Sequence, residues 1–115
     1  MAERFPKSAR LRKRRDFLRV QERGTKVAVG SLLALVQRNE GGVTRLGLTV
    51  SSKVGNSVVR NRIRRTLREL YRKRQGSFPA GLDLVLVARA SAKDAGFARL
   101  AQDFERVVAQ VARQF

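Results

Sequence analysis

The side chains best suited to binding chemistry gather in one basic segment, VVRNRIRRTLRELYRKR at residues 58–74. From Lys53 to Arg74 the chain carries nine Lys and Arg but only one acid, Glu69. Arginine donates parallel hydrogen bonds to phosphate and stacks on bases, so this composition indicates a polyanionic partner. Whether the segment also carries out a reaction depends on which other groups accompany it.

The basic segment is expected to form a helix that follows Asn56 or Ser57 as N-cap and ends near Arg74. At about 100° per residue its apolar side chains share one face, a core-facing stripe of Val59, Ile63, Thr66, Leu67 and Leu70. The remaining arc carries like charges four residues apart, which destabilise a helix that is merely solvated. We therefore predict that nucleic acid lies against Arg60, Asn61, Arg62, Arg64, Arg65 and Arg68.

The net charge of +17 over 115 residues is concentrated in two segments. Residues 1–26 carry +7 and residues 53–74 carry +8, whereas 27–52 and 75–115 carry +1 each. An anionic membrane surface is the weaker alternative, because the apolar stripe of the basic helix is needed to cover a sheet. Composition does not distinguish DNA from RNA, but one amide among many arginines favours backbone or shape recognition over base readout.

Groups that could catalyse hydrolysis are scarce in this chain. It has no Cys and no His, which excludes thiolate chemistry, the usual general base and zinc sites built from these residues. The nine acids are scattered, with Asp83 alone in a strand and Asp103 and Glu105 on different sides of a helix, so no metal site is predicted. No apolar run is long enough to span a bilayer and no signal peptide is evident, so we expect a cytoplasmic protein.

The pattern along the chain predicts one α+β domain over residues 1–115, with 1–9 as an extended tail. Helices are expected at 13–23, stopped by Gly24, at 57–74, and from 91–95 onward. The last helix shows an apolar stripe of Phe97, Leu100, Ala101, Phe104, Val107, Val108 and Val111. Strands are expected at 26–29, 32–37, 45–51 and 82–90.

Two statements about the sheet follow from these elements. Residues 32–51 predict a hairpin around the turn NEGG at 39–42. The strand–helix–strand unit from 46 to 88 predicts a parallel pair, with the doubly apolar last strand in the centre of the sheet. The expected architecture is a two-layer α/β sandwich.

The string SSKVGNSVVRNRIRRTLRELYR, at 51–72, resembles the signature of the bacterial ribonuclease P protein subunit. The resemblance extends to FPKSARLRKRRDF (5–17), TRLGLTV (44–50) and LDLVLVARA (82–90). It implies the element order α-β-β-β-α-β-α and a four-stranded sheet, similar to a domain of a ribosomal protein. It also implies a left-handed βαβ crossover, whereas general rules favour the right-handed form.

The resemblance further implies that the chain is the protein subunit of an RNA-based endoribonuclease that removes the 5′ leader from precursor tRNA. In this family the RNA performs the hydrolysis with Mg²⁺, and the protein binds both the catalytic RNA and the single-stranded leader. The implied partners are therefore the catalytic RNA and the leader, with no membrane and no obligate protein partner. The scarcity of catalytic groups in the chain agrees with this division, in which the RNA carries out the hydrolysis and the protein binds.

Residue roles are carried over by the same resemblance. Arg60, Asn61 and Arg62 match the Arg-Asn-Arg signature that lies against the catalytic RNA. Phe17 corresponds to an aromatic of the leader-binding cleft, although core packing with Val20 is an even alternative. Many relatives have a second aromatic one turn later, where this chain has the polar Gln21 as a possible contact instead. The remaining predicted contacts are Gln21, Ser51 and Lys53 for the leader, and Arg12, Lys13, Arg14 and Arg15 as additional basic residues.

Two alternative functions rest on charge and size alone. A ribosomal or RNA-chaperone protein of similar fold would sediment with ribosomal subunits and show no preference for the catalytic RNA. A DNA-binding regulator would release RNA when duplex DNA is added.

Overall fold

The computed structural model describes residues 10–115, and the tail expected at 1–9 lies outside the described residues. Its elements in chain order are α1 (Arg14–Arg23), β1 (Thr25–Val29), β2 (Leu32–Arg38), β3 (Arg45–Val50), α2 (Ser57–Arg74), β4 (Leu82–Ala88) and α3 (Gly96–Gln114). Two short 3-10 helices, η2 (Gln75–Ser77) and η3 (Ala90–Asp94), follow α2 and β4. The predicted order of helices and strands is confirmed.

The four strands form one sheet in the order β1-β2-β4-β3. β4 pairs in parallel with β3 and antiparallel with β2, so the predicted central, partly parallel strand is confirmed. The hairpin predicted over residues 32–51 is wrong, because β4 lies between β2 and β3, and β2 forms its hairpin with β1. Leu84, Val85 and Leu86 are fully buried on both faces of β4, which only a central position allows. The handedness of the β3–α2–β4 connection stays a prediction.

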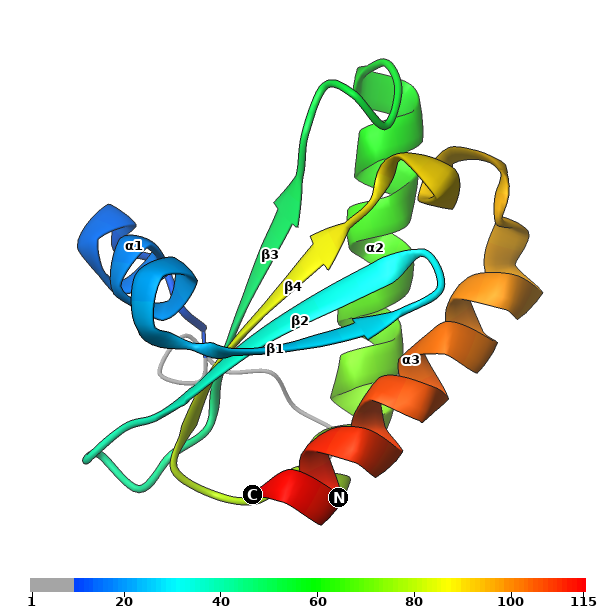
Figure 1. Cartoon of the computed structure of the whole chain (residues 1–115). Helices are drawn as coiled ribbons and strands as arrows, with labels where there is room; N and C mark the ends of the chain where they lie inside the picture. The colour runs from blue at the N-terminus through cyan, green and yellow to red at the C-terminus, as the bar shows by residue number, and fades with distance from the viewer. Residues whose placement is uncertain (1–9) are drawn as a thin grey trace.

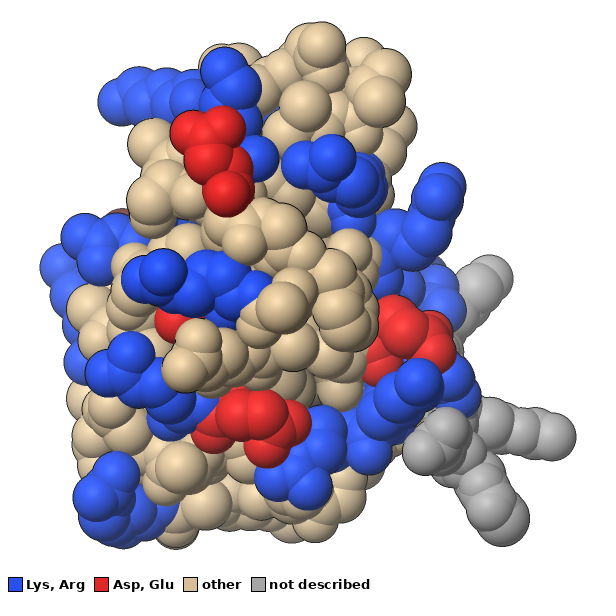
Figure 2. All heavy atoms as spheres, turned by 90° about the vertical axis from the view of Figure 1, so that its right-hand side faces the viewer, with Lys and Arg blue, Asp and Glu red and all other residues tan. Residues whose placement is uncertain are grey.

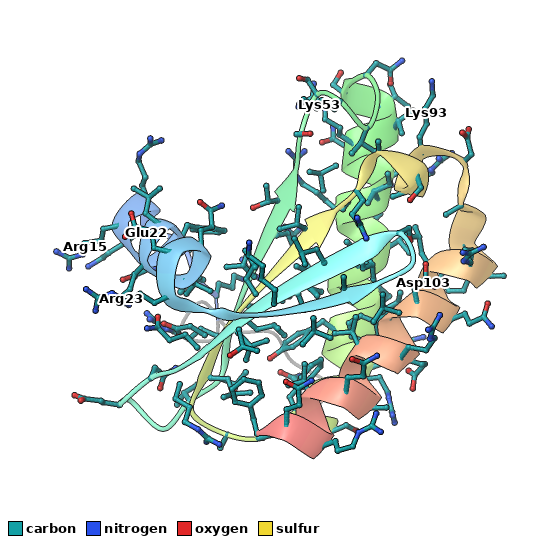
Figure 3. All side chains as sticks on the ribbon, viewed as in Figure 1. Arg15, Glu22, Arg23, Lys53, Lys93 and Asp103 are labelled. Atoms are coloured by element: carbon teal, nitrogen blue, oxygen red, sulfur yellow. The ribbon has the colours of Figure 1, made fainter. Side chains whose placement is uncertain are left out.

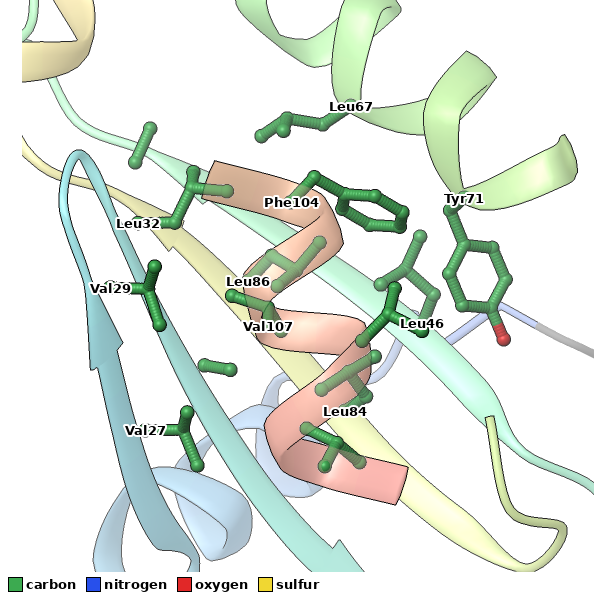
Figure 4. Close-up of a cluster of buried hydrophobic side chains, with 14 of the residues drawn as sticks. Val27, Val29, Leu32, Leu46, Leu67, Tyr71, Leu84, Leu86, Phe104 and Val107 are labelled. Atoms are coloured by element: carbon green, nitrogen blue, oxygen red, sulfur yellow. The ribbon is translucent and has the colours of Figure 1, made fainter. Parts of the chain in front are cut away.

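Helices cover the two faces of this sheet unequally (Figure 1). α2 and α3 pack together on one face, and the ten-residue α1 lies on part of the other. The main core lies under α2 and α3, where Leu67, Tyr71 and Phe104 meet Leu84 and Leu86 of β4 (Figure 4). A smaller cluster of Leu11, Val20, Leu35 and Val85 joins α1 to the sheet.

α3 buries most of its predicted stripe but not all of it. Leu100, Phe104, Val107, Val108 and Val111 are buried, and Ala101 is half-buried. Phe97 is 65% exposed, so its assignment to the core is wrong. The chain enters the core earlier, through the buried Ala92 of η3, and α3 begins only at Gly96. Neither α3 nor any other helix within residues 10–115 is long and apolar enough to cross a membrane.

Gly24 ends α1 at the predicted position, but for a different reason. Its φ of −72° is open to any residue, so the left-handed conformation that favours glycine is not used here. A Cβ on this residue would lie 2.5 Å from the Val20 carbonyl oxygen and 3.2 Å from the Val36 backbone nitrogen. Glycine is required here mainly because a Cβ would collide with the last turn of α1, and the nearby β2 leaves little room for it to move.

A buried carboxylate joins α3 to the β1–β2 turn. Asp103 is 1% exposed, and its Oδ2 accepts hydrogen bonds from the backbone nitrogen of Ser31 at 2.9 Å and from its hydroxyl at 2.7 Å. Burial by itself raises the pKa of Asp103, but the Ser31 bonds and the charge of Arg99 outweigh it and lower that pKa. Gly30 fits the turn because its φ is +53° and a Cβ would touch the carboxylate.

We predict that Asp103→Ala lowers the free energy of unfolding at pH 7 by about 2 kcal/mol, because two buried donors of Ser31 lose their acceptor. Since the folded pKa of Asp103 is lowered, its contribution is present above the unfolded pKa and is lost as the pH falls through the folded value. Urea unfolding at pH 7, and again at a pH below the folded pKa of Asp103, measures this contribution. The exposed Asp94→Ala is the control, and equal losses in the two variants would contradict the assignment.

Candidate nucleic-acid interface

The orientation of α2 is fixed by three side chains one turn apart. Ile63 and Leu67 are fully buried and Tyr71 is 1% exposed, while Asn56 caps the helix by accepting a hydrogen bond from the Val59 nitrogen at 3.0 Å. The predicted stripe is confirmed, with its members at the edges only half-buried. Tyr71 was missed, although it follows Leu67 by four residues on the same face. Burial raises the pKa of Tyr71 to about 12.

The N-terminal half of α2 presents its arginines without acidic partners. Arg60 Nε donates to the Gly55 carbonyl at 3.2 Å, and Arg64 donates to Asn61 Oδ1 at 3.1 Å and to the Val50 carbonyl at 3.4 Å. These bonds turn Arg60 and Arg64 toward the β3–α2 connection. Three further arginines that precede Glu69 are exposed and form no ion pair within the part of the chain that the structure describes: Arg62, Arg65 and Arg68.

The basic residues at the C-terminal end of α2 pair with two acids. Glu69 forms ion pairs with Arg72 and Lys73, and the hydrogen bond from Arg72 lowers the pKa of Glu69. Arg74 reaches Glu105 of α3 at 3.0 Å. The side of the molecule where α2 and α3 lie accordingly shows acidic side chains among the basic ones (Figure 2). The unpaired positive charge of α2 therefore stops near Glu69.

A hollow of about 320 Å³ opens between the start of α1, β3 and α2. We call it the β3 hollow and define it by its lining: Arg10, Leu11, Arg12, Phe17, Leu46, Gly47, Leu48, Arg64 and Arg68. Four of these nine residues are arginines and none is acidic. The hollow thus combines a strongly positive rim with an apolar, partly aromatic wall, which suits a nucleotide.

Phe17 is both a packing residue and a wall of the β3 hollow. It is half-buried against the cluster of α1, and a Cβ on Gly47 would lie 2.5 Å from its ring. Its two predicted alternatives are therefore compatible, since the side chain packs against the cluster of α1 and also lines the hollow. Gly47 was not predicted as a site residue. The signal was a glycine in the middle of an otherwise apolar strand, which often marks a close approach of another group.

An open strip of sheet adjoins Phe17 on the face that carries α1. The register aligns Leu33, Val87 and Thr49 on this face, two residues beyond the row of Leu35, Val85 and Gly47 that α1 covers. All three side chains of the outer row are half-buried. Two aliphatic side chains and a threonine, rather than a second aromatic, therefore lie beside Phe17.

The structure brings only some of the predicted contacts together. Phe17, Arg12, Arg64 and Arg68 line the β3 hollow. Gln21 is exposed on α1, and Lys13, Arg14 and Arg15 are exposed around its start. Ser51 and Lys53 are exposed in the β3–α2 connection, with Lys53 well away from α1 (Figure 3). These residues and the other α2 arginines do not line the hollow.

A larger hollow of about 620 Å³ is lined by Arg19 of α1 and by residues of β2, the β2–β3 loop, β3 and β4, and both acidic and basic side chains face it. Asp83, predicted to stand alone, instead accepts bonds from Arg45 at 2.8 and 2.9 Å and from Asn39 at 2.9 Å. Arg19 approaches Asp83 at 3.5 Å and pairs with Asp16 at 3.0 Å. Burial by itself raises the pKa of Asp83, but these bonds outweigh it and lower that pKa. This network fastens α1 to the sheet.

The family model described as Ribonuclease P matches residues 5–112. The chain belongs to the ribonuclease P protein family. It is 38% identical over 111 residues to the ribonuclease P protein component of Citrifermentans bemidjiense, covering 96% of this chain and 95% of the relative. It is 45% identical over 101 residues to that of Gluconacetobacter diazotrophicus, covering 86% and 87%.

Solved ribonuclease P proteins share the fold. The Staphylococcus aureus protein superposes with a TM-score of 0.84 at 34% identity, covering 91% of this chain and 98% of that one. The Thermotoga maritima protein gives a TM-score of 0.81 at 28% identity, covering 89% and 96%. The α+β architecture read from the sequence is thus shared with members of the ribonuclease P protein family.

We predict that replacing Arg60, Arg62 and Arg65 by Ala weakens RNA binding and lowers the slope of log affinity against log salt by about two to three units, because each lost phosphate contact retains counterions. Filter binding across a salt series measures the slope. The matched control replaces Arg72, Lys73 and Arg74, whose side chains pair with Glu69 and Glu105, and should change the slope by less than about one unit. Equal slopes for the two triple variants would contradict the division of α2.

Proposed function

We propose that this chain is the protein subunit of ribonuclease P and supports endonucleolytic removal of the 5′ leader from precursor tRNA. Family membership supports this proposal, and so do curated relatives named ribonuclease P protein component. The observation that carries it is the unpaired half of α2, which borders the β3 hollow and the aromatic ring of Phe17. One surface thus offers phosphate-binding arginines next to a site for an unpaired base.

We assign the hydrolysis to the RNA and its Mg²⁺. Among residues 10–115 no three His, Cys, Asp or Glu side chains stand close enough together to hold a metal ion. The buried carboxylates are already engaged, Asp16 and Asp83 by arginines and Asp103 by Ser31. The residues present therefore do not fit a Mg²⁺ ion held by the protein alone. The protein's part is to bind and orient both RNAs, and its positive charge stabilises closely spaced phosphates.

Two groups of residues divide the binding work in this proposal. The exposed arc of α2, with Arg60, Asn61, Arg62 and Arg65, lies against the catalytic RNA. Phe17 and the open strip of Leu33, Val87 and Thr49 receive the single-stranded leader. The residues that stand apart, Gln21, Ser51 and Lys53, contact more distant nucleotides of the leader.

Reconstitution with the catalytic RNA tests the proposal. Purified chain added to that RNA at low Mg²⁺ should raise the rate of leader removal, because its arginines replace part of the metal's charge neutralisation. The chain without RNA should cleave nothing. Absence of any rate gain, together with sedimentation on ribosomal subunits or displacement of RNA by duplex DNA, would favour the alternative binding functions.

A second prediction separates leader binding from packing at Phe17. Phe17→Ala should weaken holoenzyme affinity for precursor tRNA about tenfold, since stacking on one base contributes roughly 1–3 kcal/mol. Affinity for leaderless tRNA should change little. Phe17→Leu is the control, because it preserves apolar packing but removes the ring. Like Phe17→Ala, it should lose affinity for precursor tRNA and keep its affinity for leaderless tRNA. An equal loss on both substrates would assign Phe17 to the core alone.

A further inference from the structure

β3 is an edge strand whose outer side is only partly occupied. Its inner side pairs with β4 along the whole strand. On the outer side the Leu11 nitrogen donates to the Leu46 carbonyl at 2.8 Å, and Arg10 forms a short parallel bridge with Leu46. Two residues beyond Leu48, Arg64 donates to the Val50 carbonyl at 3.4 Å. Both ends of the outer edge therefore have partners.

The main chain of Leu48 lies between these two occupied positions. Backbone groups of alternate residues in a strand point to the same side, so Leu48 directs its N–H and its C=O outward with those of Leu46 and Val50. Neither group has a hydrogen-bond partner among residues 10–115. Leu48 is also one of the residues that line the β3 hollow. A donor and an acceptor on a rigid strand thus face a space open to ligand.

The surroundings decide what kind of ligand fits there. A peptide strand is excluded because the open edge is one residue long between Leu46 and Val50. Arg64, Arg68 and Phe17 all line the opening, and no acid lines the hollow. The absence of a Cβ at Gly47 lets the Phe17 ring approach the strand. A ligand that complements these groups carries anionic charge, a flat apolar body and an edge with hydrogen-bonding groups. An unpaired nucleotide has all three features.

We propose that the β3 hollow binds one unpaired nucleotide, whose base pairs edge-on with the Leu48 main chain beside Phe17 and whose phosphate is held by Arg64 and Arg68. This proposal rests on the proposed function and adds to it a base contact made by the backbone. A main-chain donor and acceptor pair with a base whatever side chain occupies position 48. Such a site would bind an unpaired base through geometry and would not need an Asn or Gln reader.

The test replaces the Leu48 amide by an ester in the full chain, assembled with catalytic RNA. The ester removes the N–H donor and leaves the side chain in place. An ester at Val43, which is 51% exposed in the β2–β3 loop and does not line the β3 hollow, is the matched control, because it makes the same amide-to-ester change away from the proposed site. Substrates are precursor tRNAs in which one leader nucleotide at a time lacks its base, with leaderless tRNA and the catalytic RNA alone as further ligands. Thermal unfolding of each variant is recorded in parallel.

The ester at Leu48 should lower affinity for intact precursor tRNA about three- to tenfold, the usual effect of one hydrogen bond, whereas the ester at Val43 should not. One abasic leader position should cause a similar loss in the wild type and none in the Leu48 ester variant, which identifies the bound nucleotide. If the loss instead appears equally in affinity for the catalytic RNA, the site is supported and its nucleotide belongs to that RNA. Wild-type affinity for all these ligands in the Leu48 ester variant would overturn the proposal.

The two proposals fail differently. If the wild-type chain neither stimulates cleavage nor distinguishes leader from leaderless substrate, the proposed function fails first. If the wild type does both and the Leu48 ester variant behaves identically, only the contact by the Leu48 main chain fails.

Discussion

The burial of Ile63, Leu67 and Tyr71 against the sheet fixes how α2 is rotated about its axis, and most other properties of the surface depend on it. With one face fully buried, every arginine of the helix must lie on the remaining arc. Like charges then stand one turn apart and repel one another unless a polyanion neutralises them. The core therefore determines both where the charge is displayed and the kind of partner that stabilises it.

The position of β4 in the sheet is the second feature on which the binding surface depends. Because β4 is apolar on both faces it occupies the centre of the sheet, and β3 is left at the edge next to α2. The β3 edge, α1 and α2 then enclose the β3 hollow. In a hairpin of β2 and β3, the inner edge of β3 would pair with β2, and β3 would be separated from β4. The binding surface is thus a product of strand order as much as of the basic residues.

Local patterns in the sequence were sufficient for the elements and for the division of α2 into buried and exposed faces, because both follow from helical periodicity. The patterns gave the parallel pairing of β3 with β4 and the central place of β4, but not the whole strand order, since they also paired β2 wrongly with β3. Phe97 fitted the periodicity of α3 but lies beyond the packed part of the helix. Gly47 and the partners of Asp83 depend on contacts between segments far apart in the chain. The roles of individual site residues came from the family resemblance and stay predictions.

Directed cleavage of the catalytic RNA tests most directly whether the unpaired half of α2 faces RNA. The chain has no cysteine, so an iron chelate can be attached at one introduced position: Val58→Cys, 75% exposed at the start of α2, or Gln102→Cys, exposed on α3. Hydroxyl radicals generated from position 58 should cut a defined region of the bound RNA, and those from position 102 should cut none. Equal cleavage from both positions, or cleavage from position 102 alone, would contradict the account.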